Sequence, residues 1–139
     1  NKIGITPEAC SSWFLPRIVG MSQALEWVYT GEILKPEQAL AGRYVKAVVP
    51  ADQLLEEAYK IARRIAQHSP VAIALTRQMM YRNAAQDHPI EAHKVDSLAI
   101  FYTSLNDGKE GVQSFLEKRP PTFTGRTSTD MPEFYPWWE

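Results

Sequence analysis

The chain has 139 residues, 45% hydrophobic and 22% charged, a balance typical of a soluble globular domain with an apolar core. Its net charge of −1 and the lack of a long basic run argue against binding to nucleic acid or to a membrane surface. One cysteine cannot form an internal disulfide, and its spacing from the three histidines fits no metal site, so a reducing compartment, the cytoplasm, is expected.

The first residues and the apolar runs bear on targeting. No apolar run reaches the roughly eighteen residues of a membrane span, and the start carries no secretory signal. The chain opens on Asn1, with Ile3 and Ile5 on either side of Gly4, as if a strand or loop were already under way. We therefore expect these residues to be the interior and C-terminal part of a longer protein, folded as one domain.

Two helices are predicted in the first thirty residues. The order Thr6-Pro7-Glu8 is that of an N-cap, a first-turn proline and a first-turn acid, so the first helix is expected to begin there. It runs toward residue 17 or 18, and Gly20 ends it. A second helix begins at Ser22 and ends at Gly31, which stands where a left-handed residue is favoured.

A third helix and a strand follow. Lys35-Pro36-Glu37 starts a short helix that Gly42 closes. Residues 44–49, YVKAVV, favour a strand, which Pro50 stops. This is the one clear strand predicted for the chain.

Three longer helices are predicted after the strand. Residues 54–65 carry apolar side chains at the i, i+4, i+7 spacing of one buried face. Pro70 and Pro89 each open a further helix, and these helices run through Met79 and Leu105 respectively.

The last helix and the tail complete the pattern. Asp107 and Glu110 form a capping-box pattern ahead of the final helix, which the prolines 120 and 121 end. The remaining tail has no helical period but carries five aromatic residues, so it is expected to pack along another surface.

These elements predict a mainly α fold with one clear short strand. A lone strand leaves backbone donors and acceptors unpaired, which is costly when they are buried. Its partner is expected either near Lys2–Thr6 or in sequence outside this chain.

Glu8 is the strongest candidate for a catalytic group, because no Gly-rich phosphate loop, HExxH, GxSxG or CxxC motif occurs. It stands among small residues and bulky apolar ones, which favour a general base by withdrawing a carboxylate from water. An acid in the first turn of a helix is also stabilising by about 0.3–1 kcal/mol whatever the protein does. Catalysis and helix capping therefore both stay open for Glu8.

Lys118 and Arg119 form the second candidate cluster, beside Phe115. Cations at the end of a helix complement its dipole without any ligand. The functional alternative is a clamp for the phosphate groups of a ligand, next to an aromatic ring.

Four consecutive segments carry a further pattern: GITPEACSSWFLPRIVG (4–20), ALEWVYTGE (24–32), EQALAGxxVxxVVP (37–50) and DxxEGVxSFLEKRxPxF (107–123). Together they resemble the enoyl-CoA hydratase/isomerase (crotonase) superfamily over nearly the whole chain. The resemblance implies the C-terminal helical part of an α/β crotonase (ClpP-like) spiral fold. It assigns residues 1–50 to the end of the spiral core, 51–119 to a helical oligomerisation region, and 120–139 to an aromatic extension.

The resemblance implies an enzyme of fatty-acid β-oxidation type that acts on acyl-CoA thioesters. The pattern PExCSS, residues 7–12, is similar to the Δ3,Δ2-enoyl-CoA isomerase subgroup, whose single catalytic glutamate would match Glu8. The donors for the thioester oxyanion would lie upstream. The alternatives are a 2-enoyl-CoA hydratase that uses upstream glutamates, and a non-catalytic helical assembly module.

The resemblance also implies the substrate contacts and partners. Trp13, Phe115 and Lys118 would bind substrate, with Phe115 lining the acyl or CoA pocket and Lys118 approaching the CoA phosphates. No cofactor or metal is expected, since the coenzyme A arrives with the substrate. The helical part would build a homotrimer, or a hexamer made of two trimers.

Overall fold

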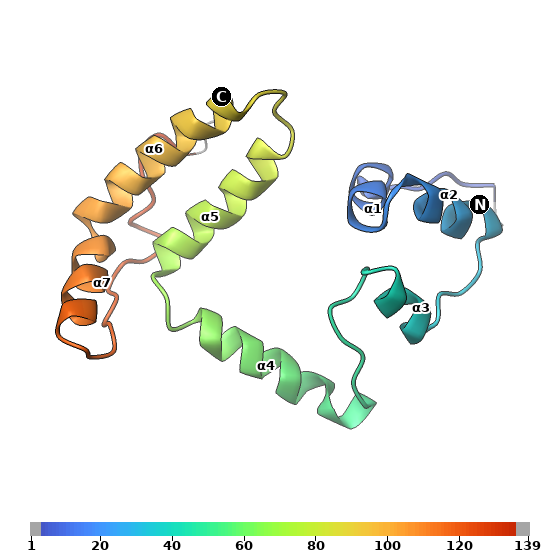
Figure 1. Cartoon of the computed structure of the whole chain (residues 1–139), viewed down its shortest axis with the longest axis horizontal. Coiled ribbons are helices and arrows are strands. Elements are labelled where there is room, and N and C mark those ends of the chain that lie inside the picture. The colour runs from blue at the N-terminus through green and yellow to red at the C-terminus, as the bar shows by residue number, and fades with distance from the viewer. Residues whose placement is uncertain (1–3, 136–139) are drawn as a thin grey trace. The chain divides into compact units, whose positions relative to one another are not determined.

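The structure is a computed structural model that describes residues 4–135. Helices account for all the regular structure in this range (Figure 1). They are α1 (Ser11–Val19), α2 (Met21–Thr30), α3 (Pro36–Ala41), the 3-10 turn η1 (Ala51–Gln53), α4 (Leu54–Ile65), α5 (Pro70–Asn83), α6 (Pro89–Leu105) and α7 (Asp107–Leu116). The chain divides between Leu54 and Leu55 into two compact units, and each is taken by itself below.

In the first unit, α1 and α2 pack against each other, and Ala24 is buried between them. Gly31 ends α2 as predicted: its φ of 57° is left-handed, and its N–H donates to the Trp27 carbonyl at 3.1 Å. The prediction that α1 begins at Thr6 was wrong. Ala9 and Cys10 adopt φ of 52° and 57°, and two left-handed residues in succession cannot continue a right-handed helix.

The third helix forms and ends near Gly42 as predicted, but the strand predicted at residues 44–49 was wrong. The N–H groups of Tyr44 and Val45 both turn back to the Ala39 carbonyl, at 2.9 and 3.3 Å. The following residues have no strand to pair with in the described part of this unit, and without a partner a strand's backbone groups are not satisfied by a ladder.

The second unit is built around α5, α6 and α7, which pack in sequence (Figure 1). Leu75 of α5, only 1% exposed, is the most buried large side chain, and Val95 and Ala99 of α6 are buried as well. Both helices begin at prolines as predicted. Their caps are the Ser69 hydroxyl, which accepts from the Ala72 N–H at 3.2 Å, and the His88 ring, which accepts from the Ile90 N–H at 3.1 Å.

Helix α4 forms where its period predicted, but its expected buried face was wrong for this structure. No residue of α4 is buried, and Leu55 and Tyr59 are 69% and 58% exposed. Within its own unit α4 has no extensive packing against another described helix, so its apolar stripe has nothing to be buried against.

The tail packs on α6 and α7, which confirms the prediction for its described residues. The Tyr102 hydroxyl donates to the Asp130 carbonyl at 2.9 Å, and the rings of Tyr102 and Phe134 meet edge to face at 6.1 Å. The last residues of the aromatic extension, 136–139, lie outside the described range.

The capping box predicted for Asp107 and Glu110 was wrong, because both carboxylates bind the tail instead. Asp107 Oδ1 accepts from the backbone N–H groups of Thr124 and Gly125, each at 3.3 Å. Glu110 Oε1 accepts from the Thr122 N–H at 2.7 Å. Two acids separated by one turn of α7 thus fasten three residues of the tail.

Candidate functional site

Glu8 lies in the turn ahead of α1 and not in the helix itself. Its carbonyl accepts hydrogen bonds from the Ser11 N–H at 2.9 Å and from the Ser11 hydroxyl at 2.5 Å. The first turn of α1 holds no acid, and the residue is exposed. The helix-capping interpretation of the Glu8 side chain therefore does not hold, and its carboxylate projects from a turn whose backbone is fixed by Ser11.

This turn is under local strain. Ala9 and Cys10 follow Glu8 directly and are both left-handed, although neither is glycine. A side-chain-bearing residue in this region costs roughly 1–2 kcal/mol relative to a right-handed one. Such strain is concentrated at functional sites, where it orients a particular group.

An apolar cavity of about 130 Å³ adjoins the turn. It lies between α1 and α2, and Pro7 and Ser11, on either side of Glu8 in the sequence, belong to its wall. The remaining lining residues are Ser12, Leu15, Pro16, Met21, Ala24, Leu25 and Val28. A cavity with this lining fits a short hydrocarbon group rather than a charged one.

Trp13, a predicted substrate contact, belongs to the same unit. Its backbone N–H donates to the Cys10 carbonyl at 2.9 Å, which ties it to the strained turn. The Arg17 guanidinium lies 3.8 Å from the centre of the indole ring and donates to the Trp13 carbonyl at 3.0 Å. Phe14 meets the ring edge to face at 4.8 Å. One face of the indole is thus covered by a cation.

Phe115 and Lys118, the other two predicted substrate contacts, stand together at the end of α7 in the second unit. Phe115 is 81% exposed. Lys118 is left-handed, with φ of 55°, and its N–H donates to the Phe115 carbonyl at 3.2 Å. Glu8 and Trp13 thus belong to the first unit, and Phe115 and Lys118 belong to the second.

Arg119 is held by two carboxylates, so the predicted clamp of two free cations does not form. Its Nη1 and Nη2 atoms contact the two oxygens of Glu110 at 2.6 and 2.9 Å, and its Nε atom contacts Glu117 at 2.5 Å. Two hydrogen bonds lower the pKa of Glu110 to about 2: the one from the Arg119 side chain contributes most, and the one from the Thr122 backbone N–H comes second. Hydrogen bonds from Gln113 and Arg119 likewise lower the pKa of Glu117.

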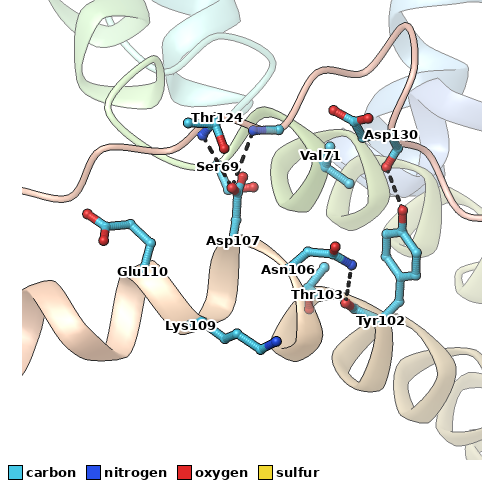
Figure 2. A pocket seen from close by; sticks show the side chains of 11 residues that line it. Ser69, Val71, Tyr102, Thr103, Asn106, Asp107, Lys109, Glu110, Thr124 and Asp130 are labelled. Atoms are coloured by element: carbon cyan, nitrogen blue, oxygen red, sulfur yellow. Dashed lines mark hydrogen bonds between the residues drawn. The ribbon is translucent and has the colours of Figure 1, made fainter.

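A second, more polar cavity of about 320 Å³ lies where the tail crosses α6 and α7 (Figure 2). Figure 2 shows Asp107 reaching up from the start of α7 to the tail amides, with Ser69 next to its carboxylate and Val71 to its right. Asp107 Oδ2 is buried and accepts no hydrogen bond within residues 4–135. Sequence reasoning missed this role, because an acid that starts a helix has the same pattern whether it caps the helix or binds another segment.

Within the described residues, no group of three or more metal-ligating side chains is found. None of the described helices is long and apolar enough to cross a membrane.

Comparisons with known proteins agree with one another. Residues 1–126 match a family model described as enoyl-CoA hydratase/isomerase. The chain is 41% identical over 124 residues to Enoyl-CoA hydratase AFT3-1 of Alternaria alternata, covering 86% of this chain and 41% of that protein. It is 34% identical over 126 residues to the 2,3-dehydroadipyl-CoA hydratase of Escherichia coli K12, covering 89% of this chain and 49% of that protein.

Solved structures show the same likeness. An enoyl-CoA hydratase from Bacillus anthracis matches with a TM-score of 0.83 and 31% identity, over 90% of this chain and 48% of that one. A putative enoyl-CoA hydratase/isomerase from Mycobacterium abscessus matches with a TM-score of 0.82 and 30% identity, over 90% of this chain and 52% of that one. The chain thus spans about two fifths to one half of the proteins it matches.

Proposed function

The chain belongs to the enoyl-CoA hydratase/isomerase family, and from this premise we propose that it serves isomerisation of an enoyl-CoA thioester with Glu8 as the base. Its helices are the C-terminal helical part of the crotonase fold. The complete catalytic unit would join them to an upstream segment that supplies the oxyanion donors.

The proposed reaction is a proton transfer within the acyl group. The Glu8 carboxylate removes a proton from carbon 2 of a 3-enoyl thioester, and the electron pair moves into a dienolate. The protonated Glu8 then returns the proton at carbon 4, so the double bond ends between carbons 2 and 3. The negative charge on the thioester oxygen is held by the upstream donors. No cofactor is consumed, because the coenzyme A is part of the substrate.

The position of Glu8 carries this proposal. Glu8 lies three residues before α1, so its side chain does not cap that helix. Its carbonyl accepts a hydrogen bond from the Ser11 N–H, and Ser11 lines the apolar cavity. An acid that only capped a helix would need to stand within the first turn. A carboxylate carried by a turn that adjoins an apolar cavity suits proton removal from a hydrocarbon carbon that the cavity brings close.

Hydration of a 2-enoyl-CoA is the second candidate function. The relatives from Alternaria and Escherichia coli are both named hydratases, which favours it. Addition of water needs a carboxylate to position and deprotonate the water, and the upstream glutamates would fill this role. Analysis of the products formed from 2-enoyl and 3-enoyl esters by the full-length protein distinguishes the two reactions.

A helical assembly module is the third candidate, and the exposed apolar side chains of the second unit favour it. They include Leu55 and Tyr59 on α4, and Phe101 on α6. Large exposed apolar side chains are common at protein interfaces, and together with the family membership they lead us to propose a homotrimer, or a hexamer of two trimers. Sedimentation gives the assembly state. If assembly were its only role, replacement of Glu8 would leave the function of the full-length protein intact.

We further propose that Lys118 binds the phosphate groups of the CoA ester and that Phe115 packs beside the same ligand. No ion pair of Lys118 is found among the described residues, so its ammonium is available to an anion.

Replacement of Glu8 by glutamine in the full-length protein, with isomerisation and hydration followed in parallel, tests the proposed base. Replacement of Lys118 by alanine tests the phosphate contact, and an unchanged KM would remove it.

A further inference from the structure

The turn that carries Lys118 is stabilised by contacts of the next residue, Arg119. After α7 ends, Lys118 enters the left-handed region, and the Arg119 N–H returns to the Ser114 carbonyl at 3.0 Å. A lysine has no intrinsic preference for this conformation, since its Cβ crowds the backbone there. Neighbouring contacts must therefore keep the turn in place.

The Arg119 guanidinium supplies those contacts. It forms a two-pronged pair with Glu110, one turn into α7, and a third contact with Glu117 at the end of the helix. Glu110 also accepts from the Thr122 N–H, and Glu117 accepts from the Gln113 side chain. The side chain next to Lys118 is thus anchored to α7 at two points, and one of these also holds the tail.

We propose that Arg119 is a positioning residue that acts through Lys118: its pairing with Glu110 and Glu117 fixes the turn that presents the Lys118 ammonium to the phosphate oxygens of a CoA ester. The inference rests on the proposed role of Lys118 as a phosphate-binding residue. Arg119 is assigned no phosphate contact of its own, because four of its five N–H donors are directed to two carboxylates and to the Pro120 carbonyl.

The planar fork of Arg119 is the part that a lysine cannot replace. Arginine binds a carboxylate through two parallel hydrogen bonds, whereas lysine offers a single charged point on a flexible stem. Arg119→Lys therefore keeps the charge near the phosphates but loses the geometry of the anchor. A purely electrostatic contribution would survive this change, and a positioning role would not.

The test uses the full-length enzyme and four variants: Lys118→Ala, Arg119→Lys, Glu110→Gln and the double variant Lys118→Ala/Arg119→Lys. Each is assayed with the CoA ester and with the matching pantetheine thioester, which lacks the nucleotide phosphates. Lys94→Gln is the matched control, because it breaks an ion pair with Glu91, 2.7 Å long, that lies within α6. Thermal unfolding confirms that every variant is folded.

We expect Lys118→Ala to raise the KM of the CoA ester by about tenfold, the scale of one charged hydrogen bond. Arg119→Lys and Glu110→Gln should raise it by about threefold or more while kcat changes by less than about twofold, since only ground-state binding is weakened. Neither change should alter the KM of the pantetheine thioester. In the double variant, the KM of the CoA ester should be close to that of Lys118→Ala alone, because Arg119 acts through Lys118.

Three outcomes would overturn the inference. If Lys118→Ala raises KM but Arg119→Lys and Glu110→Gln do not, the positioning role is wrong and the proposed phosphate contact stands. If Arg119→Lys raises the KM of the CoA ester and of the pantetheine thioester equally, its effect does not act through the phosphate groups. If Lys118→Ala itself leaves KM unchanged, the phosphate contact fails and the inference fails with it. If Arg119→Lys does not fold, Glu117→Gln replaces it in the test, because this change leaves the pair of Arg119 with Glu110 intact. Glu117→Gln is expected to raise the KM of the CoA ester by a smaller factor and to leave the KM of the pantetheine thioester unchanged.

Discussion

Gly42 stands against the ring of Trp27 so closely that a Cβ atom at position 42 would lie 2.5 Å from the Cη2 atom of the indole. The indole ring also meets the Tyr44 ring edge to face, with the ring centroids 6.2 Å apart. Trp27 therefore joins α2 to the end of α3, and the closure of the third helix depends on the absence of a side chain at Gly42.

Gly42→Ala is expected to destabilise the first unit by about 1–3 kcal/mol, because the added methyl group must displace the indole ring. Gly111→Ala in α7 is the matched control. Its nearest neighbour, Phe123, would be 3.8 Å from the new Cβ atom, an ordinary contact, and alanine favours a helix by about 0.5–1 kcal/mol over glycine. Denaturant unfolding measures both. A neutral Gly42→Ala variant would contradict this packing.

Gly125→Ala is expected to release the tail from α7. A Cβ atom at Gly125 would lie 2.7 Å from Asp107 Oδ2 and 3.2 Å from Val71. The hydrogen bonds from the two backbone N–H groups to Asp107 would therefore lengthen. Hydrogen exchange at residues 122–130 should accelerate. Thr124→Ala is the control, because it keeps the backbone N–H that Asp107 binds and should leave exchange unchanged. Equal exchange in both variants would show that Asp107 does not hold the tail.

The ion pair of Glu110 with Arg119 predicts a pH dependence of stability at acid pH. The pKa of Glu110 falls from 4.5 to about 2 on folding, chiefly through its hydrogen bonds with Arg119. A carboxyl with a lowered folded-state pKa contributes stability that is full above 4.5 and is lost as pH falls toward 2. The difference in Tm between the wild type and Glu110→Gln should therefore narrow across this range. A constant difference would rule out the ionised pair as its source.

Helix positions in this chain could be predicted from local sequence, because their signals are local. Proline at a first helical position and glycine after a last one act within a few residues, which is why α2, α5 and α6 were predicted near their observed bounds. The strand at 44–49 was not predictable in this way. Whether a strand-favouring segment pairs depends on a partner that its own residues do not specify.

The site residues show the same division. The sequence offered Glu8 as a candidate base, but it could not show that two left-handed residues would keep this acid out of α1, since alanine and cysteine rarely take that conformation. It also read Asp107 and Glu110 as caps of their own helix. Their actual partners lie nine to eighteen residues further along the chain, and such contacts leave no periodic signal.

The central claim is that Glu8 is the base, and Glu8→Gln in the full-length protein tests it most directly. Glutamine keeps the shape of the side chain but cannot take up the proton from carbon 2. Glu37→Gln is the matched control, because Glu37 lies in the first turn of α3 and should affect only stability, by about 0.3–1 kcal/mol.

The measurement is the rate of 3-enoyl-CoA isomerisation, with 2-enoyl-CoA hydration followed in parallel and folding checked by thermal unfolding. We predict that Glu8→Gln lowers isomerisation by about 10²–10⁴-fold, the usual contribution of a positioned general base, with CoA binding and folding retained. Isomerisation and hydration rates both close to those of the wild type and of Glu37→Gln would contradict the account and place the base elsewhere.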